Sequence, residues 1–250
     1  MEQGRDGRVA VVTGVGHREG IGFAIARRLL ADGARVMVHA LTTDDALLAE
    51  LGANPESLAS IDADLADRDA PHMVIERTVD VFGAVDALVV NHAHSSDQSL
   101  GSVTVEELDR AWAVNSRAAV LLAQAFAAHH DDARPAGRIV FLTSGQHLGP
   151  MPGELPYVLG KAAVQGATRT LADELADRGI TVNAVNPGPV DTGWPSDALR
   201  SRLAPAFPAG RWGRPDDVAP LVAWLVSPES AWITGQTIDA EGGFRRGAAG

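Results

Sequence analysis

The sequence predicts an α/β protein built on a doubly wound parallel sheet of about seven strands with helices on both faces. Short β-branched apolar runs alternate along the chain with stretches of helical periodicity, which is the order expected of βαβ units. Several of the apolar runs leave no polar face, so we expect them to be buried on both sides of the sheet. The 250 residues contain no internal repeat, low-complexity tract or linker, and the sequence therefore predicts a single domain over residues 1–250.

Seven short apolar runs are predicted to be strands, at residues 8–13, 35–39, 58–61, 86–90, 138–143, 180–185 and 236–240. Helices are predicted at residues 21–30, 44–51, 67–82, 104–130, 156–178 and 216–226. A connection rich in Pro, Gly and Trp interrupts this pattern before the last helix, with a short helix expected near 196–204. Its Trp, Pro and Phe side chains are too apolar for a permanently exposed loop, so we predict that residues 189–214 form a substrate lid.

The charge balance argues against nucleic acid and membrane surfaces as partners. Lys and Arg number 21 against 32 Asp and Glu, a formal net charge of -11, and such an acidic surface repels phosphate backbones and anionic lipid. Cysteine is absent, which excludes a disulfide framework, a thiol nucleophile and a thiolate zinc site. No stretch approaches the ~20 apolar residues of a spanning helix, and the N-terminal apolar run is too short for a signal peptide. These features predict a cytoplasmic protein.

Four glycines crowd the junction between the first predicted strand and the first predicted helix. Gly14, Gly16, Gly20 and Gly22 surround Ile21, where the helical pattern begins. Glycine lets the backbone approach a pyrophosphate, and the N-terminus of a helix supplies N–H donors to it. The alternative is a tight turn without a ligand, which the position in the first βα unit disfavours. The loop therefore favours dinucleotide binding and a Rossmann-type fold.

The only tyrosine, Tyr157, and the only lysine, Lys161, lie four residues apart in a predicted helix, on one helical face. Hydride transfer to a carbonyl leaves an alkoxide that needs a proton, and a phenol can supply it. A nearby ammonium stabilises phenolate, so we expect Lys161 to lower the pKa of Tyr157 from its ordinary value near 10. Arginine is a poor substitute because of its fork geometry. The pair therefore predicts a catalytic acid and its activator, against the alternative of two unrelated helix-surface residues.

Several ordered motifs together resemble the short-chain dehydrogenase/reductase family, of the type that includes the 3-oxoacyl-acyl-carrier-protein reductases. They are TGVGHREGIG, Asn91, the spacing of Ser144 from Tyr157 and Lys161, Asn186-Pro187-Gly188, RWGRPDDVA at 211–219 and ITGQTIDAEGGF at 233–244. The resemblance covers nearly the whole chain. It implies hydride transfer between a nicotinamide cofactor and a carbonyl or secondary alcohol, such as a ketone or a 3-oxoacyl group.

The chain departs from the family pattern at two places. Five residues, Val15 to Glu19, separate Gly14 from Gly20, where the family usually has three. His17 and Arg18 lie on this enlarged loop and are counted with the cofactor-binding residues. After the fourth predicted strand, Asn91-His92-Ala93-His94 stands where the family has Asn-Asn-Ala-Gly. A bulky, titratable side chain therefore replaces the glycine.

The resemblance adds two residues to the catalytic pair. Ser144 follows a predicted strand at its carboxyl end, where doubly wound sheets bind ligands, and is expected to hydrogen-bond the substrate oxygen. Asn115 matches the family residue that holds a water linked to the lysine, and an Asn in an otherwise apolar helix needs a polar partner if it is buried. The alternatives are a solvent-exposed loop serine and an exposed helix Asn. The predicted catalytic residues are Asn115, Ser144, Tyr157 and Lys161.

The end of the second strand bears on cofactor choice. Ala40 stands where the family places the acidic residue that grips the ribose 2'-OH of NAD, so NADP(H) is favoured and NAD(H) remains an alternative. His39, Thr42 and above all Arg18 are candidates to receive a 2'-phosphate, although Asp44 and Asp45 weaken the case. By resemblance, Asp64-Leu65 lie against adenine, and Pro187-Gly188 with Val190 and Thr192 lie on the nicotinamide side. The alternatives are a helix N-cap and a plain turn. The predicted cofactor-binding residues are Gly14, Gly16, His17, Arg18, Gly20, Ile21, Gly22, Ala40, Asp64, Leu65, Asn91, Tyr157, Lys161, Pro187, Gly188, Val190 and Thr192.

Side chains that flank these motifs are candidates for the substrate pocket, but their mixed polarity names no substrate. The candidates are His94, Gln146, His147, Met151, Leu155 and Trp194. The pairs His92-x-His94 and His129-His130 lack companion ligands, so no metal is expected.

Three functions compete. The first is an NAD(P)(H)-dependent oxidoreductase acting on a small carbonyl or alcohol, with a carrier-bound acyl chain as one option, and working as a homo-oligomer (a tetramer or dimer). The second uses the same residues for a non-redox elimination. The third is a regulatory protein that binds a nucleotide without chemistry. The intact Ser, Tyr, Lys and Asn set favours the first.

Overall fold

One parallel sheet of seven strands, in the order β3-β2-β1-β4-β5-β6-β7, organises the computed structural model. The structure describes residues 7–52 and 54–248, so both ends of the predicted domain 1–250 lie outside it. The strands are β1 Val9–Thr13, β2 Arg35–Ala40, β3 Leu58–Asp62, β4 Ala87–Val90, β5 Arg138–Leu142, β6 Thr181–Asn186 and β7 Thr237–Asp239. The order reverses beside β1, since the chain adds β2 and β3 on one side and then returns to place β4 on the other. The predicted doubly wound sheet is confirmed.

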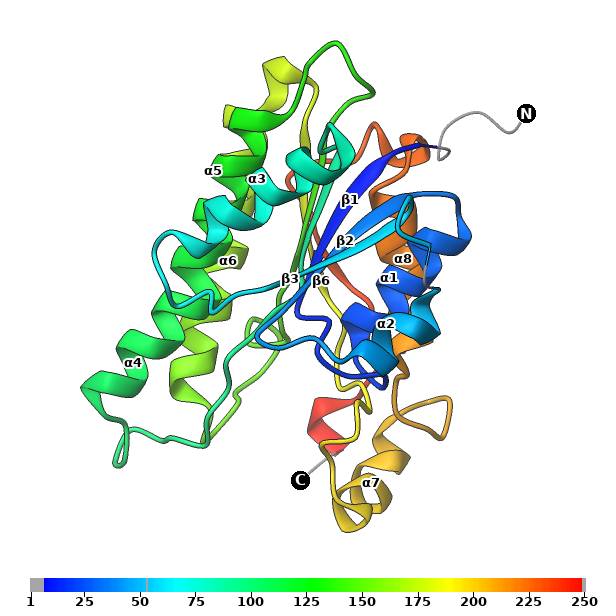
Figure 1. The fold of residues 1–250 in the computed structure, drawn as a ribbon. Helices are drawn as coiled ribbons and strands as arrows, with labels where there is room; N and C mark the ends of the chain where they lie inside the picture. The colour runs from blue at the N-terminus through cyan, green and yellow to red at the C-terminus, as the bar shows by residue number, and fades with distance from the viewer. Residues whose placement is uncertain (1–6, 53, 249–250) are drawn as a thin grey trace.

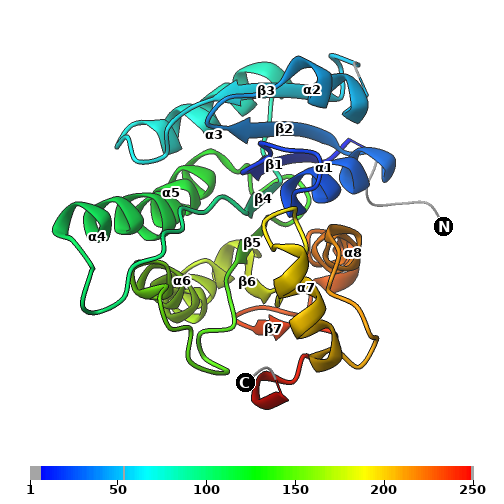
Figure 2. The same ribbon diagram turned by 90° about the horizontal axis from the view of Figure 1, so that it is seen from below.

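Helices cover both faces of the sheet, as Figures 1 and 2 show. The α-helices are α1 Ile21–Ala31, α2 Asp45–Leu51, α3 Ala70–Phe82, α4 Val105–Ala111, α5 Ala118–His129, α6 Leu155–Glu174, α7 Asp197–Leu203 and α8 Pro215–Leu225. Helices α1, α2 and α8 pack on one face, and α3, α5 and α6 pack on the other. Each face has its own apolar core, so the inner strands β2, β1, β4, β5 and β6 are buried on both sides, whereas the edge strands β3 and β7 are partly exposed.

The period-two alternation of side chains in β1 connects the strand to both cores. Val9 and Val11 belong to the core beneath α3, α5 and α6. Ala10 and Val12 belong to the core beneath α1 and α8. All four are at most 2% exposed, so β1 tolerates no polar residue until Thr13, where the strand ends. The first polar groups therefore appear at the carboxyl edge of the sheet.

Two predicted helices differ in detail from the observed ones. The helix predicted over 104–130 is interrupted by a π-helical segment, Trp112–Arg117, which we call the π turn. The helix predicted over 67–82 begins at Ala70, because proline is tolerated in a helix only in the first turn and Pro71 occupies that turn. Within the described residues, no helix is long and apolar enough to cross a membrane.

Candidate active site

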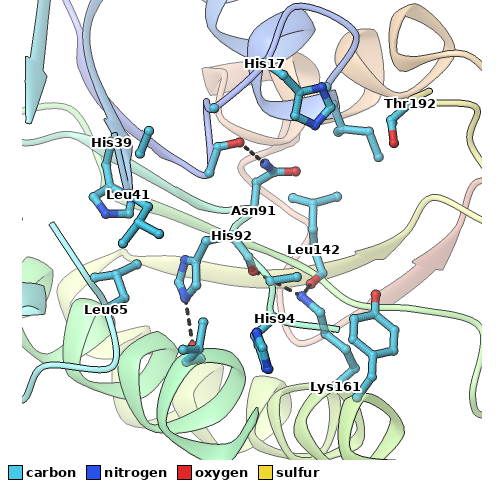
Figure 3. Close-up of a pocket in the computed structure, with 18 of the residues that line it drawn as sticks. His17, His39, Leu41, Leu65, Asn91, His92, His94, Leu142, Lys161 and Thr192 are labelled. Atoms are coloured by element: carbon cyan, nitrogen blue, oxygen red, sulfur yellow. Dashed lines mark hydrogen bonds between the residues drawn. The ribbon is translucent and has the colours of Figure 1, made fainter. Parts of the chain in front are cut away.

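A cavity of about 500 Å³ opens at the carboxyl edge of the sheet, where the strand order reverses between β1 and β4. This is where doubly wound sheets bind their ligands. Fourteen of the predicted site residues line it: Gly14, Gly16, His17, Gly20, Ile21, Ala40, Asp64, Leu65, Asn91, His94, Tyr157, Lys161, Pro187 and Thr192. Figure 3 shows side chains from both halves of the sheet converging on it. Segments far apart in the sequence thus form one site.

The glycine loop has the shape that a pyrophosphate requires. Gly14 has φ +74°, and a Cβ there would lie 2.7 Å from the backbone of His92. A Cβ on Gly22 would lie 2.6 Å from Asn91 Nδ2, the amide that donates to the carbonyls of Thr13 and Gly14. Helix α1 begins after Gly20 without a side-chain cap, so its first N–H groups are free to receive an anion. These features fit a dinucleotide.

The enlarged part of the glycine loop sends its two large side chains in different directions. His17 lines the cavity. Arg18 Nε instead pairs with Glu50 on α2 at 3.1 Å, and Arg18 lines a separate cleft beside α1 and α8. In this conformation a carboxylate holds the Arg18 guanidinium, and the contact of Arg18 with a 2'-phosphate stays a prediction.

His39, unlike Arg18, is unsuited to bind a phosphate in this structure. Its side chain is buried, and Nε2 lies 3.0 Å from the carbonyl of Ala63. Because a carbonyl only accepts, Nε2 carries the ring proton. Burial lowers the pKa of His39 below its ordinary value, so the ring is neutral and supplies no positive charge. Leu41, which the sequence did not single out, lines the cavity next to Ala40.

Asp64 is held at the predicted adenine end by two neighbours. It accepts hydrogen bonds from the backbone N–H of Ala66 at 2.9 Å and from Arg110 Nη1 at 3.1 Å. The hydrogen bond from Ala66, followed by that from Arg110, keeps the pKa of Asp64 below its ordinary value. Leu65 is buried behind it. The carboxylate is thus charged and fixed at the cavity wall.

Tyr157 and Lys161 lie one turn apart on α6, as predicted. Lys161 is 3% exposed, and its Nζ donates to the carbonyls of Leu142 at 2.8 Å and His92 at 3.4 Å (Figure 3). Burial lowers the pKa of Lys161 to about 8. Its Nζ lies 5.8 Å from the centre of the Tyr157 ring. The ammonium is therefore close to the phenol but bonded to backbone oxygens.

The pKa of Tyr157 differs from expectation. Burial raises it to about 12, while a hydrogen bond with Ser144 acts in the opposite direction. The predicted lowering of this pKa by Lys161 does not occur in this structure, where burial outweighs the effect of Ser144 and Lys161 Nζ is bonded to backbone carbonyls. Tyr157 is thus protonated at neutral pH, which is the form that donates a proton.

The structure separates the roles of Ser144 and its neighbour Thr143. Thr143 Oγ1 donates to the carbonyl of Lys161 at 3.2 Å and supports α6. Ser144 Oγ hydrogen-bonds Tyr157 and approaches Met151 Sδ at 3.8 Å. Ser144 and Tyr157 therefore lie together, while Thr143 both supports α6 and lines the cavity.

Asn115 lies in the π turn and is 2% exposed. Its Oδ1 accepts from the N–H of His94 at 2.7 Å, and its Nδ2 donates to the carbonyl of His94 at 2.8 Å. Gly160 makes room for it, since a Cβ there would lie 2.7 Å from Asn115 Cβ. The amide thus ties the loop after β4 to the π turn, which packs against helix α6 at Gly160. Its role in holding a water stays a prediction.

The nicotinamide-side motif follows β6. Gly188 N donates to Asn186 Oδ1 at 3.0 Å, and Asn186 Nδ2 donates to Asp239 and Glu241, each at 2.8 Å. Gly188 has φ +66°, and a Cβ there would lie 2.8 Å from Glu241 Cβ. Val190 is buried beside this turn. The C-terminal segment therefore packs directly beneath the motif.

The predicted substrate-pocket residues divide into two groups. His94 lines the cavity, with its Nε2 2.8 Å from Glu107 Oε1. Gln146 does not line it, because its Nε2 donates to Gln165 Oε1 at 2.6 Å. His147 is also turned away, with its Nε2 3.0 Å from Asp239. Both have partners elsewhere and do not line this cavity, and their contact with a substrate stays a prediction.

The remaining three candidates border the site. Met151 contacts Ser144, and Leu155 is the first residue of α6. Trp194 is 62% exposed and stacks edge-on against Trp212, with ring centroids 5.6 Å apart. None of the three lines the cavity: Met151 lies beside Ser144, Leu155 is two residues before Tyr157 on α6, and Trp194 lies within the predicted lid.

Two residues beside the site, Glu241 and Arg246, were not predicted from the sequence. The Glu241 side chain, 8% exposed, forms an ion pair with Arg246, whose guanidinium packs against Gly145 in the loop after Ser144. Nothing in the spacing of these residues indicated the contact. Among the described residues, no group of three or more His, Asp or Glu side chains is arranged to hold a metal ion.

The glycine loop, the cavity at the strand reversal and the Ser, Tyr and Lys side chains define the class of protein: a dinucleotide-dependent oxidoreductase of Rossmann fold. A family model described as Enoyl-(Acyl carrier protein) reductase matches residues 14–245. The chain is 42% identical over 248 residues to the "Uncharacterized oxidoreductase YjdA" of Bacillus subtilis, covering 96% of this chain and 98% of the relative.

Further relatives indicate the same kind of enzyme. The chain is 35% identical to a 3-oxoacyl-[acyl-carrier-protein] reductase of Synechocystis, covering 95% of this chain and 96% of the relative. A short-chain dehydrogenase/reductase from Serratia marcescens superposes with a TM-score of 0.86 at 32% identity, covering 95% and 98% of the two chains. The chain belongs to the short-chain dehydrogenase/reductase family, whose members use NAD(P)(H), and it is an oxidoreductase.

Proposed function

We propose that the protein reduces a ketone or 3-oxoacyl carbonyl with NADPH, or oxidises the corresponding secondary alcohol, with Tyr157 as the group that gives or takes the proton. The observation that carries this proposal is that the Tyr157 phenol and the buried Lys161 side chain line one cavity, with the Ser144 hydroxyl beside Tyr157. The reductase names of relatives such as the Synechocystis protein support it. A carrier-bound acyl chain is one candidate substrate.

In this proposal the substrate carbonyl oxygen accepts hydrogen bonds from Ser144 Oγ and the Tyr157 hydroxyl. Bound NADPH supplies the hydride, held by the glycine loop and by the Pro187-Gly188 side of the cavity. Tyr157 then donates its proton to the developing alkoxide. Lys161, with a pKa of about 8, is mostly cationic at neutral pH and lies one helical turn from the phenolate that is left. Asn115 keeps the loop after β4 against α6.

The direct test is the Tyr157→Phe variant, assayed with NADPH on a panel of ketones and 3-oxoacyl thioesters. We expect kcat to fall about 10³-fold, since a positioned general acid contributes on that order. The affinity for NADPH, measured by calorimetry, should be unchanged because the removed hydroxyl acts in the transition state. A Tyr157→Phe enzyme that turns over at the wild-type rate would overturn the assignment.

We further propose that residues 189–214 close over the nicotinamide side. Trp194 is largely exposed while its neighbour Trp212 is buried, so the segment has an apolar side chain that still lacks cover. Closure over substrate would bury it and exclude water from hydride transfer. Hydrogen exchange in this segment should slow when NADPH and a substrate analogue bind. Exchange that is slow from the start and insensitive to ligand would contradict the lid.

We also expect a homo-oligomer. Trp112, Val120 and Leu159 are exposed by 54%, 44% and 50%, and they lie on the π turn, α5 and α6. Large exposed apolar side chains on neighbouring elements favour burial against another copy. Light scattering should give a mass above that of one chain, and Leu159→Glu should lower it.

A further inference from the structure

His92, one of the residues by which the chain departs from its family pattern, connects three parts of the site. Its ring nitrogen Nε2 lies 2.9 Å from the carbonyl oxygen of Val114 in the π turn. Its Nδ1 lies 2.8 Å from Thr13 Oγ1 at the end of β1. Its own carbonyl accepts from Lys161 Nζ at 3.4 Å. Figure 3 shows the ring between the strand ends and the helix, with the bond to the π turn dashed.

The partners of His92 fix its tautomer. The carbonyl of Val114 can only accept, so Nε2 carries the proton. Nδ1 is then an acceptor, and the hydroxyl of Thr13 donates to it in preference to the carbonyl of Val89, which is farther away at 3.3 Å. Burial lowers the pKa of His92 to about 3. The ring is therefore neutral, with one donor and one acceptor, and both are used.

The π turn needs contacts from outside its own helix, such as the hydrogen bond from His92 to the carbonyl of Val114. A π segment has an extra residue in the helical repeat and is less stable than regular α-helix, which is why it occurs at functional sites. The extra residue changes the direction in which Asn115 projects. The loop that carries His92 also binds Asn115 directly, through the backbone N–H and carbonyl of His94. One short loop thus holds the π turn by a ring on one side and by its backbone on the other.

We propose that His92 is a positioning residue: by donating from Nε2 to the carbonyl of Val114 while it accepts from Thr13, it holds the π turn in register and fixes Asn115 relative to Lys161. The inference rests on the proposed function only for its effect on turnover. The effect on the π turn itself is independent of what the enzyme reduces. No change in protonation is involved.

The chain offers matched variants for a test. His92→Phe keeps the ring and loses both hydrogen bonds, whereas His92→Gln keeps one donor and one acceptor. His130→Phe is the control, because His130 is also buried, and its Nδ1 bonds a backbone carbonyl, that of Val85, at 2.9 Å. His130 lies at the opposite edge of the sheet from the cavity. It therefore reports the cost of losing a buried histidine hydrogen bond away from the site.

The first readout is hydrogen exchange of the backbone amides of residues 112–118, measured on the full chain without substrate. We expect faster exchange there in His92→Phe, near wild-type exchange in His92→Gln, and no local change in His130→Phe. This readout stands even if the proposed reaction is wrong. Unchanged exchange at the π turn in His92→Phe would overturn the inference.

The second readout is steady-state kinetics with a carbonyl substrate. His92→Phe should lower kcat about tenfold, the scale of one lost buried hydrogen bond that leaves its acceptor unpaired, with KM for NADPH unchanged. His92→Gln should recover at least half of the wild-type kcat. In an Asn115→Ala background, His92→Phe should cause no further loss. Additive losses, or an equal loss of kcat in His130→Phe, would show a general packing role instead.

Discussion

The two edges of the sheet treat buried charge in opposite ways. At the amino edge, the Asp86 side chain is fully buried and accepts from Arg134 Nε at 2.8 Å and from the N–H of Val9 at 2.9 Å. At the carboxyl edge, Lys161 is also buried, and its Nζ donates to the carbonyls of Leu142 and His92. A buried charge that pairs with an opposite charge stabilises the fold. A buried charge that is hydrogen-bonded only to backbone carbonyls indicates a functional site instead.

The pKa values express the same difference. Burial alone would raise the pKa of Asp86, but hydrogen bonds from Arg134 and Val9 hold it below its ordinary value, which favours the charged form. Burial lowers the pKa of Lys161 to about 8, which disfavours the charged form. The same direction of shift therefore stabilises the fold at one edge and destabilises it at the other. Catalytic sites characteristically contain groups, such as Lys161, whose burial lowers the stability of the fold.

The largest effect on stability is expected from Asp86→Ala. It removes the partner of Arg134 and the acceptor of Val9 N–H, so we expect unfolding to become easier by about 3 kcal/mol, because removal of one partner of a buried pair has this scale. Arg134 is partly exposed and can be hydrated in the variant, so the loss of stability should lie at the lower end of the range for buried ion pairs. Urea unfolding measures it. Asp132→Ala, which breaks the exposed pair with Arg178, is the control and should change stability far less, because an exposed pair is screened by solvent.

Asp86 also sets a pH dependence. Its folded pKa lies below the unfolded value, so its contribution is complete above the ordinary carboxylate range and is lost as the pH falls below it. The wild-type protein should therefore lose more stability than Asp86→Ala on acidification through that range. Parallel curves for the two proteins would contradict the assignment.

Lys161→Met should act in the opposite direction. The folded pKa of Lys161 is about 8 against 10.5 ordinarily, so the unfolded chain binds more protons between these values and wild-type stability rises with pH across this window. At neutral pH the variant should be more stable by up to about 3 kcal/mol, at about 1.4 kcal/mol per pKa unit. It should also flatten the pH dependence above pH 8 while losing turnover. Reduced stability at neutral pH would show that the ammonium supports the fold.

The strands and the ligand-binding edge could be predicted because their causes are local. Apolar runs such as Arg138–Leu142 predict buried strands from composition alone, and glycines such as Gly14 predict a close backbone approach. Tyr157 and Lys161 could be paired because helical spacing sets their separation. Each of these inferences needed only neighbouring residues in the chain.

The features that were missed depend on contacts between distant segments. Residues 112–117 have ordinary helical composition, and the π turn is specified by contacts with the loop of His92. Arg18 pairs with Glu50 across two elements, and Glu241 reaches Arg246 and the loop after Ser144 only in the folded chain. The pKa of Tyr157 could not be foreseen either, because its burial depends on packing rather than on the adjacent ammonium.

The smallest effect concerns Arg18, a cation at the carboxyl edge whose carboxylate partner is exposed and therefore exchangeable. If the protein prefers NADPH, Arg18 must leave Glu50 to reach a 2'-phosphate beside Ala40. Glu50→Gln should then tighten NADPH binding, and Arg18→Ala should weaken it, each by about fivefold, the scale of one exposed charge-assisted contact. NADH binding should change in neither variant, because NADH lacks the phosphate.

Ala40→Asp completes this test. It places a carboxylate where the 2'-phosphate is proposed to lie, so NADPH should weaken by repulsion while NADH gains an acceptor for its ribose hydroxyl. Calorimetry with both nucleotides on the three variants distinguishes the outcomes. If Arg18→Ala weakens NADPH and NADH equally, the guanidinium contacts something common to both. If neither changes, its partner is Glu50 alone, and Arg18 resembles the paired charges of the amino edge rather than the ligand-binding groups of the carboxyl edge.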